Sequence, residues 1–252
     1  MTKILYYDIE TAPNLAYVWG HYDQTVIAHE REWYIMCVSY KWEGKKRTKV
    51  CSLVDFSETY DKDPENDFHV VKKLWELIDE ADVVIAHNGD KFDMRKANAR
   101  FLKHGLGPPS PVKSVDTLKV ARRYFMFNSN RLNDLGKHLG LGEKVATGGF
   151  ETWAGCMRGS RKAWRTMIKY ARQDVDLLRQ VYLALRPWIK NHPNLNIFTE
   201  EHACPTCGSY NLQRRGYKTT KVSRFQQWQC NDCKSYSRSR VADKTEKPSI
   251  VP

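Results

Sequence analysis

Two acidic side chains near the N-terminus have the type and spacing that metal chemistry needs. The run from Ile4 to Ile9 favours a β-strand, and it contains Asp8 and leads directly to Glu10. Successive side chains on a strand point to opposite faces, so both carboxylates point the same way. A bound divalent cation is the usual partner that offsets the repulsion between such a pair. Taken alone, the pair is better explained by a strand that runs out into a polar turn.

Two further acids lie in predicted helices. Asp93 begins a helix, where an isolated acid ordinarily stabilises the helix dipole. Asp174 follows Tyr170 by four residues on a long helix, which places both side chains on one helical face. Three other acids are left out of the predicted site because they suit a turn, a helix cap and a different helical face: Asp90, Asp116 and Asp176.

Together these acids belong to three short segments that occur in a characteristic order: DIET at 8–11, HNGDKFD at 87–93 and YARQD at 170–174. The segments resemble the motifs of the DEDD superfamily of 3′→5′ exonucleases, which includes polymerase proofreading domains and RNase D-like enzymes. Tyr170 matches the DEDDy subgroup of this superfamily. The other subgroup has a histidine at that position. The resemblance covers roughly residues 1–190 and implies an RNase H-like fold.

The resemblance also implies a role for each side chain. Two Mg²⁺ or Mn²⁺ ions about 3.5–4 Å apart would hydrolyse a phosphodiester bond, and oxygen-rich carboxylate sites suit these ions. Asp8 would bridge the ions, Glu10 and Asp174 would complete the ion on the nucleophile side, and Asp93 would hold the other through water. Tyr170 would orient the attacking water rather than remove its proton, because the pKa of tyrosine is about 10.

Thr11 and Asn88 are weaker candidates for binding substrate. They fall where the family contacts the terminal nucleotide. A hydrogen bond at the end of a strand for Thr11, and a turn conformation for Asn88, explain these residues equally well.

Four of the seven cysteines form two closely spaced pairs, Cys204 with Cys207 and Cys230 with Cys233. Two such pairs supply the four thiolates of a tetrahedral structural Zn²⁺ site, although the intervening 22 residues, 208–229, exceed the usual spacer of about 15–20. A redox CxxC is the main alternative, but redox motifs do not normally occur as two spaced pairs. The segment looks like a zinc ribbon.

The ribbon carries much of the positive charge of the chain. The net charge is +12, and residues 203–252 contain ten Lys/Arg and three Asp/Glu. This excess favours nucleic acid as the partner. Trp228 and Phe225 are expected to fill the small core, and three arginines are the predicted substrate-binding residues: Arg214, Arg215 and Arg224.

The elements that position these residues predict an α/β fold with an RNase H-like mixed sheet flanked by helices. Strands are expected at 4–11, 34–42, 49–56 and 82–86, and loops at 11–32 and 140–149. Helices are expected at about 64–80, 92–104, 118–127, 132–139 and 161–189. The predicted organisation is an exonuclease domain at 1–190, a linker at 191–202, a Cys₄ ribbon at 203–240 and a flexible tail at 241–252.

The predicted activity is 3′→5′ exonuclease cleavage of single-stranded or frayed DNA, with DNA preferred by analogy with other ribbons. One alternative is an RNase D-like exoribonuclease, and another is a nucleic-acid-binding protein without turnover. No secretory signal or run of about 18 apolar residues is visible, so we expect no membrane association. Cysteine usage favours the cytoplasm, or the host cytoplasm for a viral chain, with a replication or recombination protein as the expected partner.

Overall fold

A computed structural model describes residues 2–22, 25–143, 148–197 and 202–243. Its centre is a five-stranded mixed sheet in the order β5-β4-β1-β6-β7. Strand β1 pairs antiparallel with β4 and parallel with β6. The strands are β1 Ile4–Thr11, β4 Ile35–Trp42, β5 Lys49–Ser52, β6 Val83–Ala86 and β7 Lys113–Asp116. The predicted α/β architecture is confirmed.

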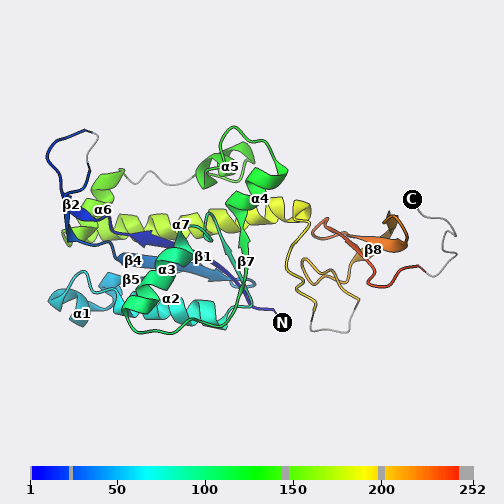
Figure 1. Cartoon of the computed structure of the whole chain (residues 1–252), viewed down its shortest axis with the longest axis horizontal. Helices are drawn as coiled ribbons and strands as arrows, with labels where there is room; N and C mark the ends of the chain where they lie inside the picture. The colour runs from blue at the N-terminus through cyan, green and yellow to red at the C-terminus, as the bar shows by residue number, and fades with distance from the viewer. Residues whose placement is uncertain (1, 23–24, 144–147, 198–201, 244–252) are drawn as a thin grey trace.

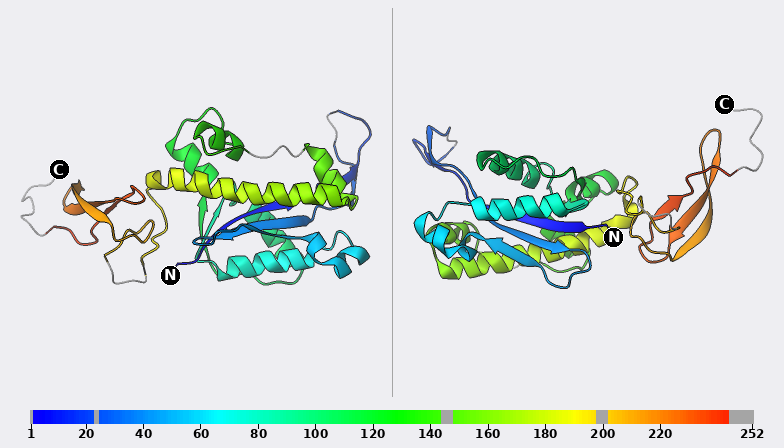
Figure 2. Two further views of the ribbon diagram at one scale, coloured as in Figure 1. Left: turned by 180° about the vertical axis from the view of Figure 1, so that it is seen from behind. Right: turned by 90° about the horizontal axis from the view of Figure 1, so that it is seen from below.

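Helices cover both faces of the sheet (Figure 2). Leu5 and Tyr7 pack in the core that contains α2 and α3, whereas Tyr6 packs against the long helix α7. This arrangement explains why β1 is buried on both faces over most of its length. The helices are α2 Phe68–Glu80, α3 Asp93–Lys103, α4 Thr117–Tyr124, α5 Leu132–His138, α6 Phe150–Met157 and α7 Arg161–Leu185.

Several predicted boundaries were wrong. The strand expected at 49–56 ends at Ser52 and gives way to the 3-10 helix η1, Leu53–Asp55, and to α1, Ser57–Lys62. Helix α2 begins at Phe68 rather than near 64. Helix α7 ends at Leu185, and the 3-10 helix η2, Arg186–Trp188, continues the chain because Pro187 cannot donate a helical hydrogen bond.

The segment expected to be a loop at 11–32 contains a small hairpin. Its strands are β2, Leu15–Tyr17, and β3, Ala28–Arg31. The glycine-rich segment expected to be a loop ends in helix α6, whose N-cap is Gly149 at a φ of 69°. Within that segment, residues 144–147 lie outside the described residues.

The C-terminal part of the chain forms a separate antiparallel sheet in the order β10-β9-β8, beyond the end of α7 (Figure 1). Its strands are β8 Leu212–Thr219, β9 Arg224–Cys230 and β10 Tyr236–Arg238. Leu195 connects it to the main sheet, because its carbonyl accepts from Thr2 Oγ1 (2.8 Å) and its amide donates to Pro205 (2.7 Å).

The domain limits stay predictions. Residues 198–201 of the predicted linker and 244–252 of the predicted tail lie outside the described residues. Among the helices that the structure describes, none combines the length and apolar character needed to cross a membrane.

Candidate metal and nucleic-acid site

The end of β1 presents two carboxylates on one sheet face. Asp8 pairs with Ser39 and Glu10 with Cys37 on the neighbouring strand β4, and both of these partners are buried. The pairing register of β1 with β4 shifts between Glu10 and Thr11, so the strand is irregular next to these two acids.

Helix α7 brings a third carboxylate to the same point. Carboxylate oxygens of Asp8, Glu10 and Asp174 all lie within 4.8 Å of one another, and Asp174 is only 3% exposed. Mg²⁺ binds oxygen at about 2.0–2.1 Å, so small side-chain rotations would let one ion contact all three groups. Three acids gathered this closely fit a cation because the cation removes their mutual repulsion.

Tyr170 lies one helical turn before Asp174 on α7. Burial raises the pKa of the Tyr170 phenol well above its usual value, and the nearby carboxylates of Asp174 and Glu10 raise it further. The ring packs edge-on against Trp153 of α6, with 5.9 Å between ring centroids. The phenol is therefore neutral at physiological pH and can donate or accept a hydrogen bond.

Asp93 occupies a different place from the three clustered acids. Its carboxylate accepts a hydrogen bond from the backbone N–H of Ile9 at 3.1 Å, which ties the start of α3 to β1. The side chain is 2% exposed, and burial raises its pKa to about 7. Asp93 therefore adjoins the cluster through the strand backbone, and its predicted role as a ligand through water stays a prediction.

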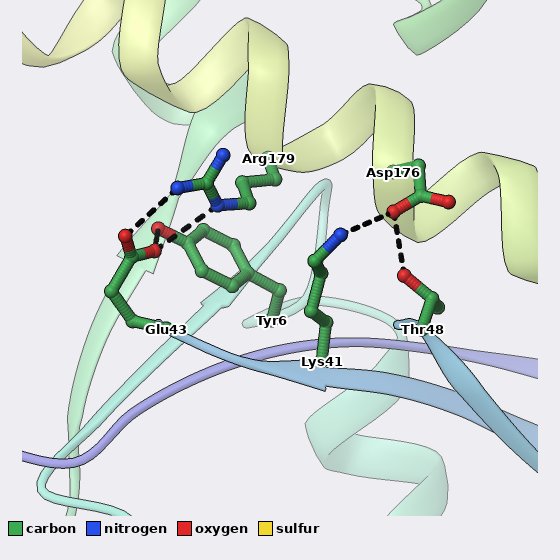
Figure 3. Close-up of polar contacts among 6 residues, drawn as sticks. All are labelled: Tyr6, Lys41, Glu43, Thr48, Asp176 and Arg179. Atoms are coloured by element: carbon green, nitrogen blue, oxygen red, sulfur yellow. Dashed lines mark hydrogen bonds and ion pairs between the residues drawn. The ribbon is translucent and has the colours of Figure 1, made fainter. Parts of the chain in front are cut away.

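A polar clamp fixes α7 over the strands (Figure 3). Asp176 Oδ1 accepts from Lys41 Nζ at 2.8 Å and from Thr48 Oγ1 at 2.6 Å. This contact accounts for Asp176 and agrees with its exclusion from the predicted site.

A second part of the clamp lies three residues further along the helix. Glu43 accepts from Arg179 Nη2 at 2.8 Å and from the Tyr6 hydroxyl at 2.7 Å. Tyr6, Asp8 and Glu10 occupy every second position of β1, so their side chains point to the same face of the sheet. The clamp therefore sets the position of α7 relative to the strand that carries Asp8 and Glu10.

The turn after β6 is held by packing and by a helix cap. The Asn88 backbone has a φ of 67° and donates its N–H to Asp116 Oδ1 at 2.9 Å, while Asp116 also caps α4 as predicted. A Cβ on Gly89 would lie 2.4 Å from the Cβ of Ala86, so this position needs glycine. For Asn88 the structure shows the turn conformation, and its predicted contact with substrate is untested.

Thr11 borders a cavity of about 380 Å³ beside the acidic cluster. The Thr11 hydroxyl accepts a hydrogen bond from Lys96 Nζ at 3.1 Å. A hydrogen bond at the end of the strand was the alternative to substrate binding for this residue. Lys96 also lies over the Trp33 ring, 4.0 Å from its centroid, and burial lowers the pKa of its ammonium. The cavity lining is Thr11, Ala12, Pro13, Asn14, Trp33, Phe92, Lys96, Phe150 and Trp153.

The rings that line this cavity are residues the sequence reasoning missed. Phe92 stands inside the HNGDKFD segment and could have been singled out from that motif. Trp33 lies between the loop expected at 11–32 and the strand expected at 34–42, and Phe150 and Trp153 belong to helix α6, which was not predicted. Only the fold brings these rings together.

The four paired cysteines converge, and all four sulfurs lie within 4.8 Å of one another. Cys204 Sγ lies 3.6 Å from Cys233 Sγ, and Cys207 Sγ lies 3.7 Å from Cys230 Sγ. These separations exceed a disulfide bond of about 2.05 Å. They fit a tetrahedral Zn²⁺ site, where Zn–S bonds of about 2.3 Å place the sulfurs about 3.8 Å apart. A small zinc-binding domain therefore fits this cluster.

The three predicted arginines do not share one surface. Arg214 lies over the ring of Trp228 at 5.4 Å, and Arg224 pairs with Asp243 at 3.2 Å. Arg215 donates from Nε to Gln229 at 3.1 Å. Arg214 and Arg215 are neighbours in the sequence, yet their side chains lie on different faces of the ribbon sheet.

Comparison with known proteins assigns the larger part of the chain. The DNA polymerase III PolC-type of Ureaplasma parvum serovar 3 (strain ATCC 700970) is 34% identical over 89 residues, which are 35% of this chain and 6% of that protein. The family B DNA polymerase structure from the hyperthermophilic archaeon Pyrobaculum calidifontis aligns with a TM-score of 0.55 at 14% identity, over 75% of this chain and 25% of that one. The chain thus spans a small part of both polymerases, and the structural likeness speaks for the fold alone.

The family model described as the RNase_H superfamily matches residues 5–186, which hold both β1 and α7. This match covers most of the chain and confirms the predicted RNase H-like fold. The chain therefore belongs to the RNase_H superfamily.

Proposed function

We propose that the protein is a metal-dependent 3′→5′ exonuclease of the DEDDy type that acts on single-stranded or frayed DNA. The observation that carries the proposal is the meeting of Asp8, Glu10 and Asp174 within 4.8 Å, with Tyr170 one turn away on α7. Nuclease chemistry also agrees with the superfamily and with the similarity to a DNA polymerase.

The acidic residues hold the ions, and Tyr170 positions the water. Asp8, Glu10 and Asp174 would hold Mg²⁺ or Mn²⁺, with Asp93 behind them as a ligand through water. When bound, two such ions activate the attacking water and stabilise the leaving oxygen. The neutral phenol of Tyr170 orients that water by a hydrogen bond, because its raised pKa keeps the proton on the oxygen.

The cavity beside Thr11 is the proposed place for the terminal nucleotide. Phe92 is 40% exposed and Phe150 64% exposed at its edge, and exposed rings stack on unpaired bases. Lys96 supplies a positive charge for a phosphate. A base can enter such a cavity only when it is unpaired, which favours a single-stranded or frayed 3′ end.

DNA is the proposed substrate because the protein that is 34% identical to this chain over 89 residues is a DNA polymerase. An RNase D-like exoribonuclease is the second candidate, since exposed rings such as Phe92 and Phe150 stack on the bases of RNA as well as DNA. A binding protein without turnover would gain nothing from three clustered carboxylates, which it would have to hold together against their repulsion.

The ribbon is proposed to bind one structural Zn²⁺ and to hold nucleic acid. Between residues 203 and 243 it carries eight Lys/Arg and two Asp/Glu, which favours a polyanion. Its four sulfurs leave no open coordination position, so the zinc supports folding rather than catalysis. A replication or recombination protein is the proposed partner class.

The test is incubation of the purified chain with 5′-labelled single-stranded DNA or RNA of equal sequence, with Mg²⁺, Mn²⁺ or a chelator. We expect a ladder of shortened DNA that depends on the metal, a much weaker one on RNA, and none with Asp8→Ala or Asp174→Ala. Tyr170→Phe should lower kcat more than it raises KM. A stronger ladder on RNA would favour the exoribonuclease, and shifted but uncut DNA would favour the binding protein.

A further inference from the structure

The ribbon sheet has two faces with different side chains. Directly paired residues of an antiparallel sheet share a face. The register pairs Arg214 with Trp228, and it places Tyr217 and Arg224 on the same side, here called the Trp228 face. The opposite side, here called the Tyr236 face, carries Gln213, Lys218, Phe225, Gln227, Gln229, Tyr236 and Arg238.

The Trp228 face is already engaged by the protein itself. The ring of His202, from the segment that enters the ribbon, packs on Trp228 with 4.5 Å between ring centroids. Arg224 forms an ion pair with Asp243 and lies over the Tyr217 ring at 4.8 Å. A nucleic acid would have to displace these contacts to bind there. Arg214 and Arg224 are therefore assigned no contact with nucleic acid, which replaces the prediction made for them from the sequence.

The Tyr236 face carries exposed basic side chains and an exposed aromatic ring. Tyr236 is 57% exposed, and the guanidinium carbon of Arg238 lies 4.0 Å from the centre of the Phe225 ring. Arg215 reaches the same face, since it donates to Gln229. The two acids described between residues 203 and 243 are engaged elsewhere, Asp232 with Ser209 and Asp243 with Arg224.

We propose that the Tyr236 face binds single-stranded nucleic acid, the stretch of the strand that lies upstream of the 3′ end held at the acidic cluster. This inference rests on the proposed exonuclease function. Arg215, Lys218 and Arg238 contact phosphates, and Tyr236 stacks on a base. The amide of Gln227 can accept a hydrogen bond from any base or donate one to it, so the face binds strands of many sequences.

The distance between the two sites sets a length requirement. Eleven residues of α7 separate Asp174 from Leu185, which is about 16 Å of helix, and the ribbon lies beyond that end (Figure 1). A short oligonucleotide can fill the acidic cluster without reaching the ribbon. A long one reaches both, so the Tyr236 face adds affinity only for long strands.

The experiment measures binding of 5′-fluorescein-labelled oligo-dT, long or short, by fluorescence anisotropy over a range of salt concentrations. The full chain with Asp8→Asn serves as the background, so that cutting does not interfere. Three variants are compared: Tyr236→Ala and Arg238→Gln on the proposed face, and Arg214→Gln as a control with the same charge change on the Trp228 face. Zinc content and thermal melting confirm that each ribbon is folded.

We expect Tyr236→Ala to weaken binding of the long strand about tenfold or more. Arg238→Gln should reduce the slope of log K against log salt by about 0.7, the contribution of one phosphate contact. Arg214→Gln should leave both quantities near those of the background, and no variant should alter binding of the short strand. Equal loss from Arg214→Gln and Arg238→Gln, or long-strand binding unchanged by both face variants, would overturn the proposal.

Cutting is measured separately with the wild-type chain, Mg²⁺ and the short strand. Absence of cutting there, with the pattern of binding expected above, would contradict the exonuclease function and leave the Tyr236 face as a binding surface. Normal cutting with no effect of Tyr236→Ala or Arg238→Gln would contradict the binding surface alone.

Discussion

The ammonium of Lys41 lies 2.8 Å from the carboxylate of Asp176, two residues beyond Asp174 on the same helix. The pair joins β4 to α7, and Lys41 is only 13% exposed. Because Asp174 must meet Asp8 and Glu10 across this interface, the position of α7 decides whether the three carboxylates can share an ion.

Asp176→Ala is expected to lower both stability and cutting. The change leaves the Lys41 ammonium and the Thr48 hydroxyl without their acceptor, which costs about 1–3 kcal/mol in the free energy of unfolding. A shifted α7 also moves Asp174, so kcat should fall while KM for a short oligonucleotide changes little.

Urea unfolding and steady-state kinetics measure these effects. The control is Glu80→Gln, which removes an exposed ion pair with Lys3 and should change stability by less than about 1 kcal/mol. Asp176→Ala with wild-type kcat would show that the clamp does not position Asp174.

Low pH should weaken the second part of the clamp, in which Glu43 accepts hydrogen bonds from Arg179 and Tyr6. Burial alone would raise the pKa of Glu43, but the hydrogen bonds from Arg179 and Tyr6 outweigh it and lower that pKa below its ordinary value of 4.5. A carboxylate whose folded pKa is lowered contributes stability that is present above its unfolded pKa. That stability is lost as the pH falls through the lower, folded pKa.

Wild type and Glu43→Gln should therefore differ most in free energy of unfolding at neutral pH, with wild type more stable. The difference should shrink as the pH falls below about 4.5 and vanish in stronger acid. Urea unfolding at a series of pH values measures it. A difference that stays constant over that range would show that the charge of Glu43 contributes nothing to the clamp.

Much of the site could be predicted from local periodicity. Strand alternation placed Asp8 and Glu10 on one face, and helical spacing placed Tyr170 with Asp174. The resemblance of the three short segments predicted that the two elements meet, whereas the contact between Lys41 and Asp176 across 135 positions of sequence required the tertiary fold. No pattern within either segment predicts which distant residue such a side chain contacts.

The parts that could not be predicted share a physical cause. Strands β2 and β3 are short, and three of the four residues of β3 are polar or charged, so they show no hydrophobic alternation. Helix α6 follows a glycine-rich stretch that indicates a loop. The face of the ribbon to which each arginine points depends on the irregular register between Arg214 and Tyr217, which no local pattern reveals.

Phe92 is expected to contribute to binding of the terminal nucleotide. Phe92→Leu keeps an apolar side chain at the cavity edge but removes the flat ring, so KM for single-stranded DNA should rise about tenfold with kcat nearly unchanged. Leu102→Ala is the control, because Leu102 is 81% exposed on helix α3, whose N-cap is Phe92, and does not line the cavity. Equal KM values for Phe92→Leu and wild type would place the terminal base elsewhere.

Removal of zinc should unfold the ribbon and spare the sheet that carries the acids. The buried part of the ribbon core consists of Cys204, Cys230 and Cys233, packed with Cys207 and Leu212, so a zinc ion bound there would supply much of its folding free energy. The main sheet has its own extensive cores and does not depend on that metal. Chelation, or Cys230→Ser with Cys233→Ser, should therefore expose the segment after about residue 203 to protease while cutting of a short oligonucleotide in fresh Mg²⁺ persists. Metal analysis and limited proteolysis with mass spectrometry measure the outcome, and a ribbon that resists protease without zinc would show that the four thiols are not a structural metal site.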